Sequence, residues 1–289
     1  MTSLLRTTIA LLPTVSAFLI LCSTFDELAG GSGAGNPGGT VAVTLKAEVS
    51  IGMAKATAGE FNKQESDTSS IVPLVVTDKA GLELYISEII FSCADFRFML
   101  DPSEDATEIL QSFNDHSSLL SSDKGSLVLG GGPYLCNGIT GEMLPSIDSV
   151  RLPVAKYTGI MLRFKDTPDF FPHDTFNKNE LFRISGTFFY YGRLCRFIVD
   201  INHSFNAPVH FAGGIFTLSD SDTTNIELRF DANKWFKGID LKKAIVTKDL
   251  QFNPNGDIFI GGHCNDSANQ KIEFAIQNAF IESGRLVVY

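Results

Sequence analysis

The chain has 289 residues, of which 33 are acidic and 23 basic, and its formal net charge is −10. This balance argues against a nucleic-acid partner, because binding a phosphate backbone needs a surplus of positive charge on at least one face. Disorder of the whole chain is excluded, since 44% of the residues are hydrophobic and 24 of them are Phe. The length suits one large domain or two small ones.

The N-terminus reads as an export signal. Arg6 gives the start a positive charge, and residues 7–21 are apolar with small hydroxyl residues and no charge. A charged start before a short apolar run is typical of secretory leaders. A membrane-spanning helix needs about 20 apolar residues, and Pro13 interrupts this run. We therefore expect residues 1–22 to be a leader, with an uncleaved anchor as the alternative.

The stretch Leu19-Ile-Leu-Cys22 resembles the lipobox of bacterial lipoproteins, with Leu19 at position −3 and Cys22 as the lipidated residue. It departs from that pattern at Leu21, where the family has Gly, Ala or Ser. Residues 23–39 are rich in Gly and follow as a tether, because Gly/Ser-rich segments behave as flexible coils. The resemblance implies a lipid anchor in the bacterial cell envelope, at the outer membrane or cell surface. Ordinary cleavage near Ala29, which gives a periplasmic or secreted protein, is the alternative.

The cysteines fit an exported protein. Without Cys22 the chain keeps an even number of cysteines, which two disulfides could join in three different pairings: Cys93, Cys136, Cys195 and Cys264. The alternative is that they are buried free thiols that act as small hydrophobic residues. Cys195 alternates in phase with Phe197 and Val199, so we expect its side chain to point into the core.

The body, residues 40–289, is predicted to be all-β and to form an antiparallel β-sandwich. If it comprises two sub-domains, their boundary lies near 145–150. Short alternating segments between turn signals are typical of a sandwich or barrel. The expected strands lie at 40–50, 82–86, 96–100, 126–129, 150–164, 181–190, 194–201, 209–211, 216–218, 226–230 and 285–289. A slip in the alternation near Glu88 predicts a β-bulge, and residues 191–193 predict a hairpin turn.

One or two short helices are expected near the C-terminus. Asp231 can cap a first turn, and Asp266 or Ser267 can cap a helix for which Gly284 is the terminator. Residues 101–126 and 166–180 are polar or irregular and are predicted to be long surface loops. Binding residues concentrate on such loops when a rigid scaffold carries them. The run from Phe188 to Tyr191 could also expose one aromatic face, since neighbouring strand residues point to opposite sides.

The sequence contains two sets of candidate metal ligands. The first combines imidazole and thiolate, the usual ligands of zinc and copper, in His203, His210, His263 and Cys264, with Cys195 as a further candidate. Surface histidines are the alternative, because no His-x-His or Cys-x-x-Cys pair is present. The second is a calcium site built from oxygen ligands: Asp220, Asp222, Asn255 and Asp257. A bare Asn255-Gly256 turn explains the second pair without an ion.

No cofactor is expected and no catalytic residue is assigned, because the chain lacks a P-loop ending and a Gly-x-Ser-x-Gly elbow. Residues Leu19–Cys22, Gly30–Gly39 and Phe230–Leu241 together resemble uncharacterised bacterial cell-envelope lipoproteins with an immunoglobulin- or transthyretin-like β-sandwich. This resemblance implies a non-enzymatic binding or structural module, held to a membrane by its N-terminal lipid, with a protein or glycan ligand.

Two alternatives stay open. One is a secreted or lipid-anchored hydrolase acting on carbohydrate, which needs two converging carboxylates. The candidates lie in or beside predicted strands: Glu83, Glu88, Asp95, Glu227 and Asp240. The other is a metal-handling envelope protein that uses the histidines and cysteine named above.

Overall fold

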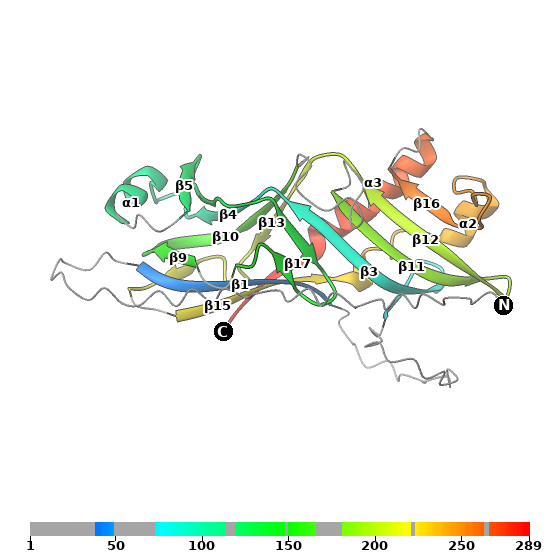
Figure 1. Ribbon diagram of the computed structural model, residues 1–289, viewed down its shortest axis with the longest axis horizontal. Coiled ribbons are helices and arrows are strands. Elements are labelled where there is room, and N and C mark those ends of the chain that lie inside the picture. Colours follow the sequence, from blue (N-terminus) through cyan, green and yellow to red (C-terminus); the bar gives the residue numbers. More distant parts are fainter. Residues whose placement is uncertain are drawn as a thin grey trace, which may run out of the picture. The chain divides into compact units, whose positions relative to one another are not determined.

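The computed structural model describes residues 38–48, 73–113, 119–147, 150–165, 181–220, 223–262 and 266–289. Residues 36–289 form one compact unit. The predicted leader, Cys22 and nearly all of the Gly-rich tether lie outside the described residues. The described part contains seventeen strands, three α-helices and one short 3-10 helix, which confirms the mainly-β prediction (Figure 1).

The strands form three sheets. The first has the order β17 (Gly284–Val288), β15 (Thr223–Asp231), β1 (Gly38–Glu48), β9 (Val150–Pro153). The second has the order β13 (Phe205–His210), β10 (Ala155–Phe164), β4 (Asp95–Leu100), β6 (Ser126–Leu129), β5 (Leu120–Asp123), and β14 (Phe216–Leu218) pairs with β10. The third has the order β16 (Ile258–Gly261), β12 (Arg193–Ile201), β11 (Phe182–Tyr190), β3 (Glu83–Cys93), β7 (Tyr134–Asn137), β8 (Met143–Leu144), and β2 (Leu74–Thr77) pairs with β3.

The sheets are mixed, and the prediction of purely antiparallel layers is wrong for two strand pairs. Strand β1 runs parallel to β15, and β12 runs parallel to β16. A parallel pair needs a long connection. The one between β12 and β16 contains β13, β14, β15 and two helices. Alternation of apolar residues marks a strand but does not encode the direction of a distant partner, so these pairings could not be predicted from local patterns.

Local predictions in the third sheet are confirmed. Strands β11 and β12 pair from Phe182 opposite Ile201 to Tyr190 opposite Arg193. Their turn is Tyr191-Gly192, with φ of 48° and 77°. Positive φ at both central residues is the tight hairpin turn that favours Gly at its second position. The predicted bulge is present as well, as a register shift between Ser185 and Gly186 opposite the segment of β3 that contains Glu88.

The helices depart from the prediction in two ways. Helix α1 (Ala106–Phe113) occupies the stretch predicted as a loop, because Asp105 Oδ1 accepts hydrogen bonds from the backbone N–H groups of Thr107 and Glu108 and so caps its first turn. Near the C-terminus η1 (Ala232–Lys234) and α2 (Leu241–Val246) are short, but α3 (Ser267–Ser283) is not. No helix among the described residues is long and apolar enough to cross a membrane.

Gly284 ends α3 in an extended conformation, with φ −68° and ψ 141°, and not in the left-handed turn that a helix terminator favours. It is the first residue of β17. A Cβ at this position would lie 2.8 Å from Val209 Cγ2 and 3.0 Å from a ring carbon of Phe230. Glycine is therefore needed here for close packing, because the chain turns directly from helix to strand.

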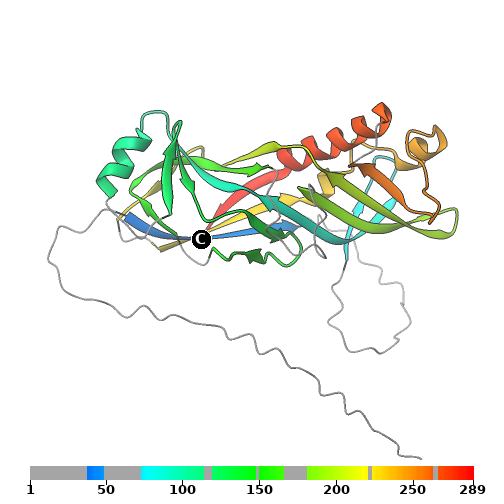
Figure 2. The same ribbon diagram turned by 45° about the horizontal axis from the view of Figure 1, so that its top comes forward.

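The core is centred on Phe280 of α3, which is fully buried. Its ring centroid lies 4.4 Å from that of Phe230 in the first sheet and 5.9 Å from that of Phe164 in the second. The ring of Phe91 in the third sheet lies 6.3 Å away. Helix α3 packs along β12, β13, β15 and β16 (Figure 2). One helix thus joins the hydrophobic faces of all three sheets.

Candidate ligand-binding site

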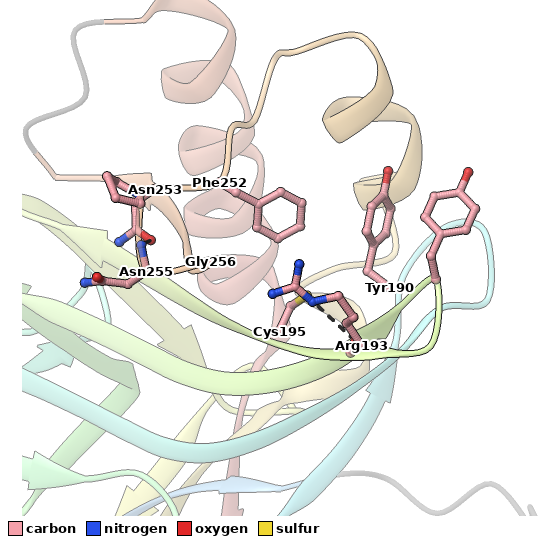
Figure 3. A pocket seen from close by; sticks show the side chains of 9 residues that line it. Tyr190, Arg193, Cys195, Phe252, Asn253, Asn255 and Gly256 are labelled. Atoms are coloured by element: carbon pink, nitrogen blue, oxygen red, sulfur yellow. Dashed lines mark hydrogen bonds between the residues drawn. The ribbon is translucent and has the colours of Figure 1, made fainter.

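A hollow of about 440 Å³ lies at the tip of the β11–β12 hairpin (Figure 3). We call it the hairpin-tip pocket. It is lined by Tyr190, Tyr191, Arg193, Cys195, Phe252, Asn253, Pro254, Asn255 and Gly256. The hairpin gives one wall, and the loop between α2 and β16 gives the other. Ligand sites are commonly concave, of this size, and lined by aromatic groups with a few polar ones.

The hairpin wall continues the core face of the sheet. Phe188 pairs with Cys195, and both are buried; the next pair on the same face is Tyr190 with Arg193. Arg193 is exposed and Tyr190 is half-buried. The core therefore ends at Phe188 and Cys195, and the pair beyond it faces the hollow.

The second wall is a loop held by its own hydrogen bonds. The side-chain oxygen of Asn253 accepts from the backbone N–H of Asn255 at 2.9 Å and of Asp257 at 2.8 Å. Gly256 has φ +85° and donates its N–H to the carbonyl of Asn253 at 3.0 Å. The Asn255-Gly256 turn predicted from the sequence is present. Because a β-bridge joins Phe252 to Ile258, the ring of Phe252 is held beside the hollow.

Three aromatic rings surround the opening. The centroids of Tyr190 and Phe252 are 5.6 Å apart, and those of Tyr190 and Tyr191 are 4.7 Å apart. The exposed fraction is 87% for Tyr191 and 36% for Phe252. Aromatic rings of this size are usually buried, so their exposure around a concavity provides apolar faces for a ligand.

Arg193 supplies the charge of the pocket. Its guanidinium points from β12 toward the second wall, and its Nη2 would lie 3.8 Å from a Cβ built on Gly256 (Figure 3). Among the described residues the guanidinium has no hydrogen-bond or ion-pair partner. The residues that line the pocket include no Asp or Glu. The described part of the pocket thus holds an uncompensated positive charge.

The described cysteines are buried and free: Cys93, Cys136 and Cys195. No disulfide joins any two of these three, while Cys264 lies outside the described residues. Burial raises the pKa of the Cys93 thiol to about 12, and it also raises that of Cys136. Cys195 points inward as predicted and forms the floor of the pocket, with its Sγ 3.7 Å from the carbonyl oxygen of Arg193.

The residues proposed for a zinc or copper site are not brought together where they are described. Cys195 lies near the start of β12 and His203 just beyond its end, which leaves roughly 20 Å of strand between them. His210 is at the far end of β13, opposite Gly159. The described residues contain no cluster of three His, Cys, Asp or Glu side chains suited to a metal. His263 and Cys264 lie outside the described part of the chain.

The ring of His203 has other partners. Its Nε2 is 2.7 Å from Oε1 of Gln277, and its Nδ1 is 3.2 Å from Oε1 of Glu273. Glu273, Gln277 and Asn269 are buried and lie at intervals of four residues on α3, which places them on one face of the helix. Burial raises the pKa of Glu273, and the neighbouring His203 opposes this shift. This polar stripe ties α3 to the end of β12.

The oxygen ligands proposed for calcium also do not converge. Asp220 follows β14 in the second sheet, whereas Asn255 and Asp257 belong to the loop before β16 in the third. Asp222 lies outside the described residues. The second pair is explained by the turn that Asn253 stabilises.

The strand carboxylates proposed for hydrolysis each have a local partner. Glu83 accepts from the Tyr85 hydroxyl, Glu88 from Ser185, and Asp240 from the backbone N–H of Lys243. Asp95 pairs with Arg97 and Arg163, and Glu227 pairs with Arg229. None of these carboxylates lines the hairpin-tip pocket.

Part of the pocket could be predicted from the sequence. The exposed aromatic face predicted for Phe188–Tyr191 supplies Tyr190 and Tyr191. Arg193 was missed, because the sequence places it in the turn and only the strand register shows that it lies opposite Tyr190. Phe252 was missed, because nothing in its local sequence shows that its loop folds against a hairpin tip about 60 residues earlier. Of the predicted binding loops, residues 166–180 lie outside the described part, and residues 101–126 contain α1 and β5.

No protein-family model matches the chain, and neither a curated protein nor a solved structure was found to match it.

Proposed function

We propose that the chain is a non-enzymatic binding module, exported and tethered to a bacterial envelope membrane through a lipid on Cys22, and that its ligand occupies the hairpin-tip pocket. The scaffold in this proposal is an immunoglobulin- or transthyretin-like sandwich, and it is supported by the mainly-β fold with buried inner faces. The lipid anchor is supported by the lipobox-like residues and the Gly-rich stretch that follows them.

One observation carries the binding assignment. The pocket places a guanidinium without a described partner next to exposed aromatic rings that the core does not need. Leaving large rings exposed costs the free energy that their burial would release, and leaving a charge without a partner adds nothing to folding. A ligand that covers the rings and pairs with Arg193 buries the exposed apolar surface and neutralises the charge.

The geometry favours a glycan over a protein as the ligand. A hollow of about 440 Å³ suits a small molecule or one to two sugar rings, whereas a protein partner needs roughly 800 Å² of surface on each side. Aromatic faces stack on the C–H faces of sugars, and Asn side chains both donate and accept hydrogen bonds. Glycoside hydrolysis needs two carboxyl groups about 5–10 Å apart, and the described lining has none, which favours binding over cleavage.

Binding is tested with the purified compact unit, residues 36–289, on an array of immobilised glycans. We expect defined glycans to be retained by the native protein and lost in Phe252→Ala. The matched control is Phe259→Ala, which removes a similarly exposed ring outside the pocket, with 40% exposure against 36%. If the native protein retains no glycan, or if Phe252→Ala and Phe259→Ala lose binding equally, this pocket is not the binding site.

The anchor is tested separately by metabolic labelling with palmitate in a bacterial host. We expect the native chain to be labelled and to fractionate with membranes, and Cys22→Ala to lose both properties. Labelling that survives the substitution would contradict lipidation at Cys22.

A further inference from the structure

We infer that the hairpin-tip pocket selects saccharides that carry an anionic group, a carboxylate, sulfate or phosphate, held by Arg193. The inference rests on the proposed function, since it names the class of ligand for the same pocket. Three properties of the lining carry it: its charge, its aromatic rings and its polar groups without described partners.

The first property is charge. The whole chain is acidic, with a net charge of −10, yet the described lining contains one cation and no anion. Arg193 has no described partner that would neutralise it. A planar guanidinium can donate two parallel hydrogen bonds to a carboxylate, sulfate or phosphate, and such charge-assisted bonds are about twice as strong as neutral ones. The negative net charge of the chain does not attract anions from a distance, so recognition depends on this local contact.

The second property is the pair of rings beside the cation. Tyr190 and Phe252 are inclined by 51° and form two sides of the hollow that Arg193 enters (Figure 3). An inorganic anion gains nothing from an aromatic face. A sugar ring presents apolar C–H groups on its face and oxygens on its edge, so it can contact the rings and the guanidinium together.

The third property is the supply of unused polar groups. The side-chain oxygen of Asn253 is taken up by the loop, but its amide N–H₂ has no described partner, and the side chain of Asn255 is exposed. Among the described residues the hydroxyl groups of Tyr190 and Tyr191 are also without partners. These groups match the hydroxyls of a saccharide, which both donate and accept hydrogen bonds.

The experiment is calorimetric titration of residues 36–289, the compact unit that contains all described strands, with trigalacturonate, its fully methyl-esterified form, a sulfated trisaccharide, a sugar phosphate and inorganic phosphate. The variant is Arg193→Gln, which keeps a polar side chain and removes the charge. Its matched control is Arg196→Gln, an exposed arginine of the same strand outside the pocket. Circular dichroism checks that both variants are folded.

We expect at least one anionic saccharide to bind. Arg193→Gln should weaken that binding about 10- to 100-fold, the loss expected for a hydrogen-bonded charge, and Arg196→Gln should leave it unchanged. Methyl esterification should cause a loss similar to that of Arg193→Gln if the ligand is a carboxylate. If the anionic group of the ligand is not a carboxylate, binding of the sulfated trisaccharide or of the sugar phosphate identifies it.

Two results would overturn the inference and leave the proposed function standing. One is equal binding of trigalacturonate and its ester without any effect of Arg193→Gln. The other is that neutral glycans bind on the array, and that this binding is lost in Phe252→Ala but kept in Arg193→Gln. If inorganic phosphate binds as tightly as the saccharides, the pocket does not select for a sugar. If no glycan binds in any experiment, the proposed function fails together with the inference.

Discussion

The rings of Tyr190 and Phe252 lie with their centroids 5.6 Å apart and their planes inclined by 51°, although one belongs to a hairpin tip and the other to a distant loop. Neither residue is held there by its neighbours in sequence alone. Tyr190 follows the core face of β11, and Phe252 is fixed by its bridge to Ile258. The shape of the proposed pocket therefore depends on the loop that carries Phe252.

Gly256 makes this loop possible and gives the first prediction. At φ +85° a residue with a Cβ is strained by about 1–2 kcal/mol. Gly256→Ala should lower the free energy of unfolding by about that amount and weaken glycan binding. Gly213→Ala is the matched control, because Gly213 has open space around it and no positive φ. Equal results for the two variants in urea denaturation would argue against the strained turn.

Phe280 gives a prediction about the fold. Because its ring contacts rings from all three sheets, Phe280→Ala should lower the free energy of unfolding by about 3–5 kcal/mol. Phe274→Ala on the same helix removes a ring that is 48% exposed and should cost much less, about 1 kcal/mol or below. Chemical denaturation of both variants measures the difference. A similar small loss for Phe280→Ala would mean that α3 is not the centre of the core.

The raised pKa of Glu273 leads to a prediction of how the free energy of unfolding depends on pH. Burial raises its pKa above the ordinary value of 4.5, so the folded protein holds this proton more tightly than the unfolded chain does. The resulting stability is fully present below pH 4.5 and is lost as the pH rises through the raised pKa. Glu273→Gln should remove this contribution, so that the free energy of unfolding changes less with pH between 4.5 and the raised pKa of Glu273.

The control for this prediction is Glu282→Gln, an exposed position on the same helix. It should leave the pH profile of the native protein unchanged. If Glu273→Gln keeps the native profile, the carboxyl does not titrate differently in the folded and unfolded states.

The burial of the cysteine thiols leads to a prediction of how fast each one is alkylated. With a pKa of about 12, only about one Cys93 thiol in ten thousand is ionised at pH 8, and the thiolate is the reactive form. Iodoacetamide should therefore modify Cys93 and Cys136 in the unfolded chain but barely in the native protein, as read by peptide mass spectrometry. Cys195 lines the pocket and should react faster than either of them. Rapid native labelling of Cys93 would contradict its burial.

Features encoded within a few residues could be predicted from the sequence. The sequence predicts a turn at residues 191–193, which the structure shows as Tyr191-Gly192, and it predicts the bulge near Glu88. It also predicts a cap at Asp266 or Ser267, and the structure shows that Asp266 is the cap. The short helix after Asp105 shows the limit of this reasoning. Its cap, Asp105, is visible in the sequence, but the surrounding polar residues favour a loop.

Features that depend on distant contacts could not be predicted. The parallel pairing of β12 with β16 brings Phe197 opposite Ile258, and no local pattern specifies that partner. The same pairing places the loop that contains Phe252 against the hairpin tip. The tyrosines of the hairpin wall could thus be predicted from alternation, whereas the second wall, which carries Phe252, required the three-dimensional fold.

Whether an anionic saccharide occupies the hairpin-tip pocket can be read from amide chemical shifts during titration with the anionic saccharide that binds best. We expect the largest shifts in residues 190–195 and 252–256, and we expect them to vanish in Arg193→Gln. Shifts that cluster elsewhere, or that persist unchanged in Arg193→Gln, would show that the saccharide does not bind in this pocket.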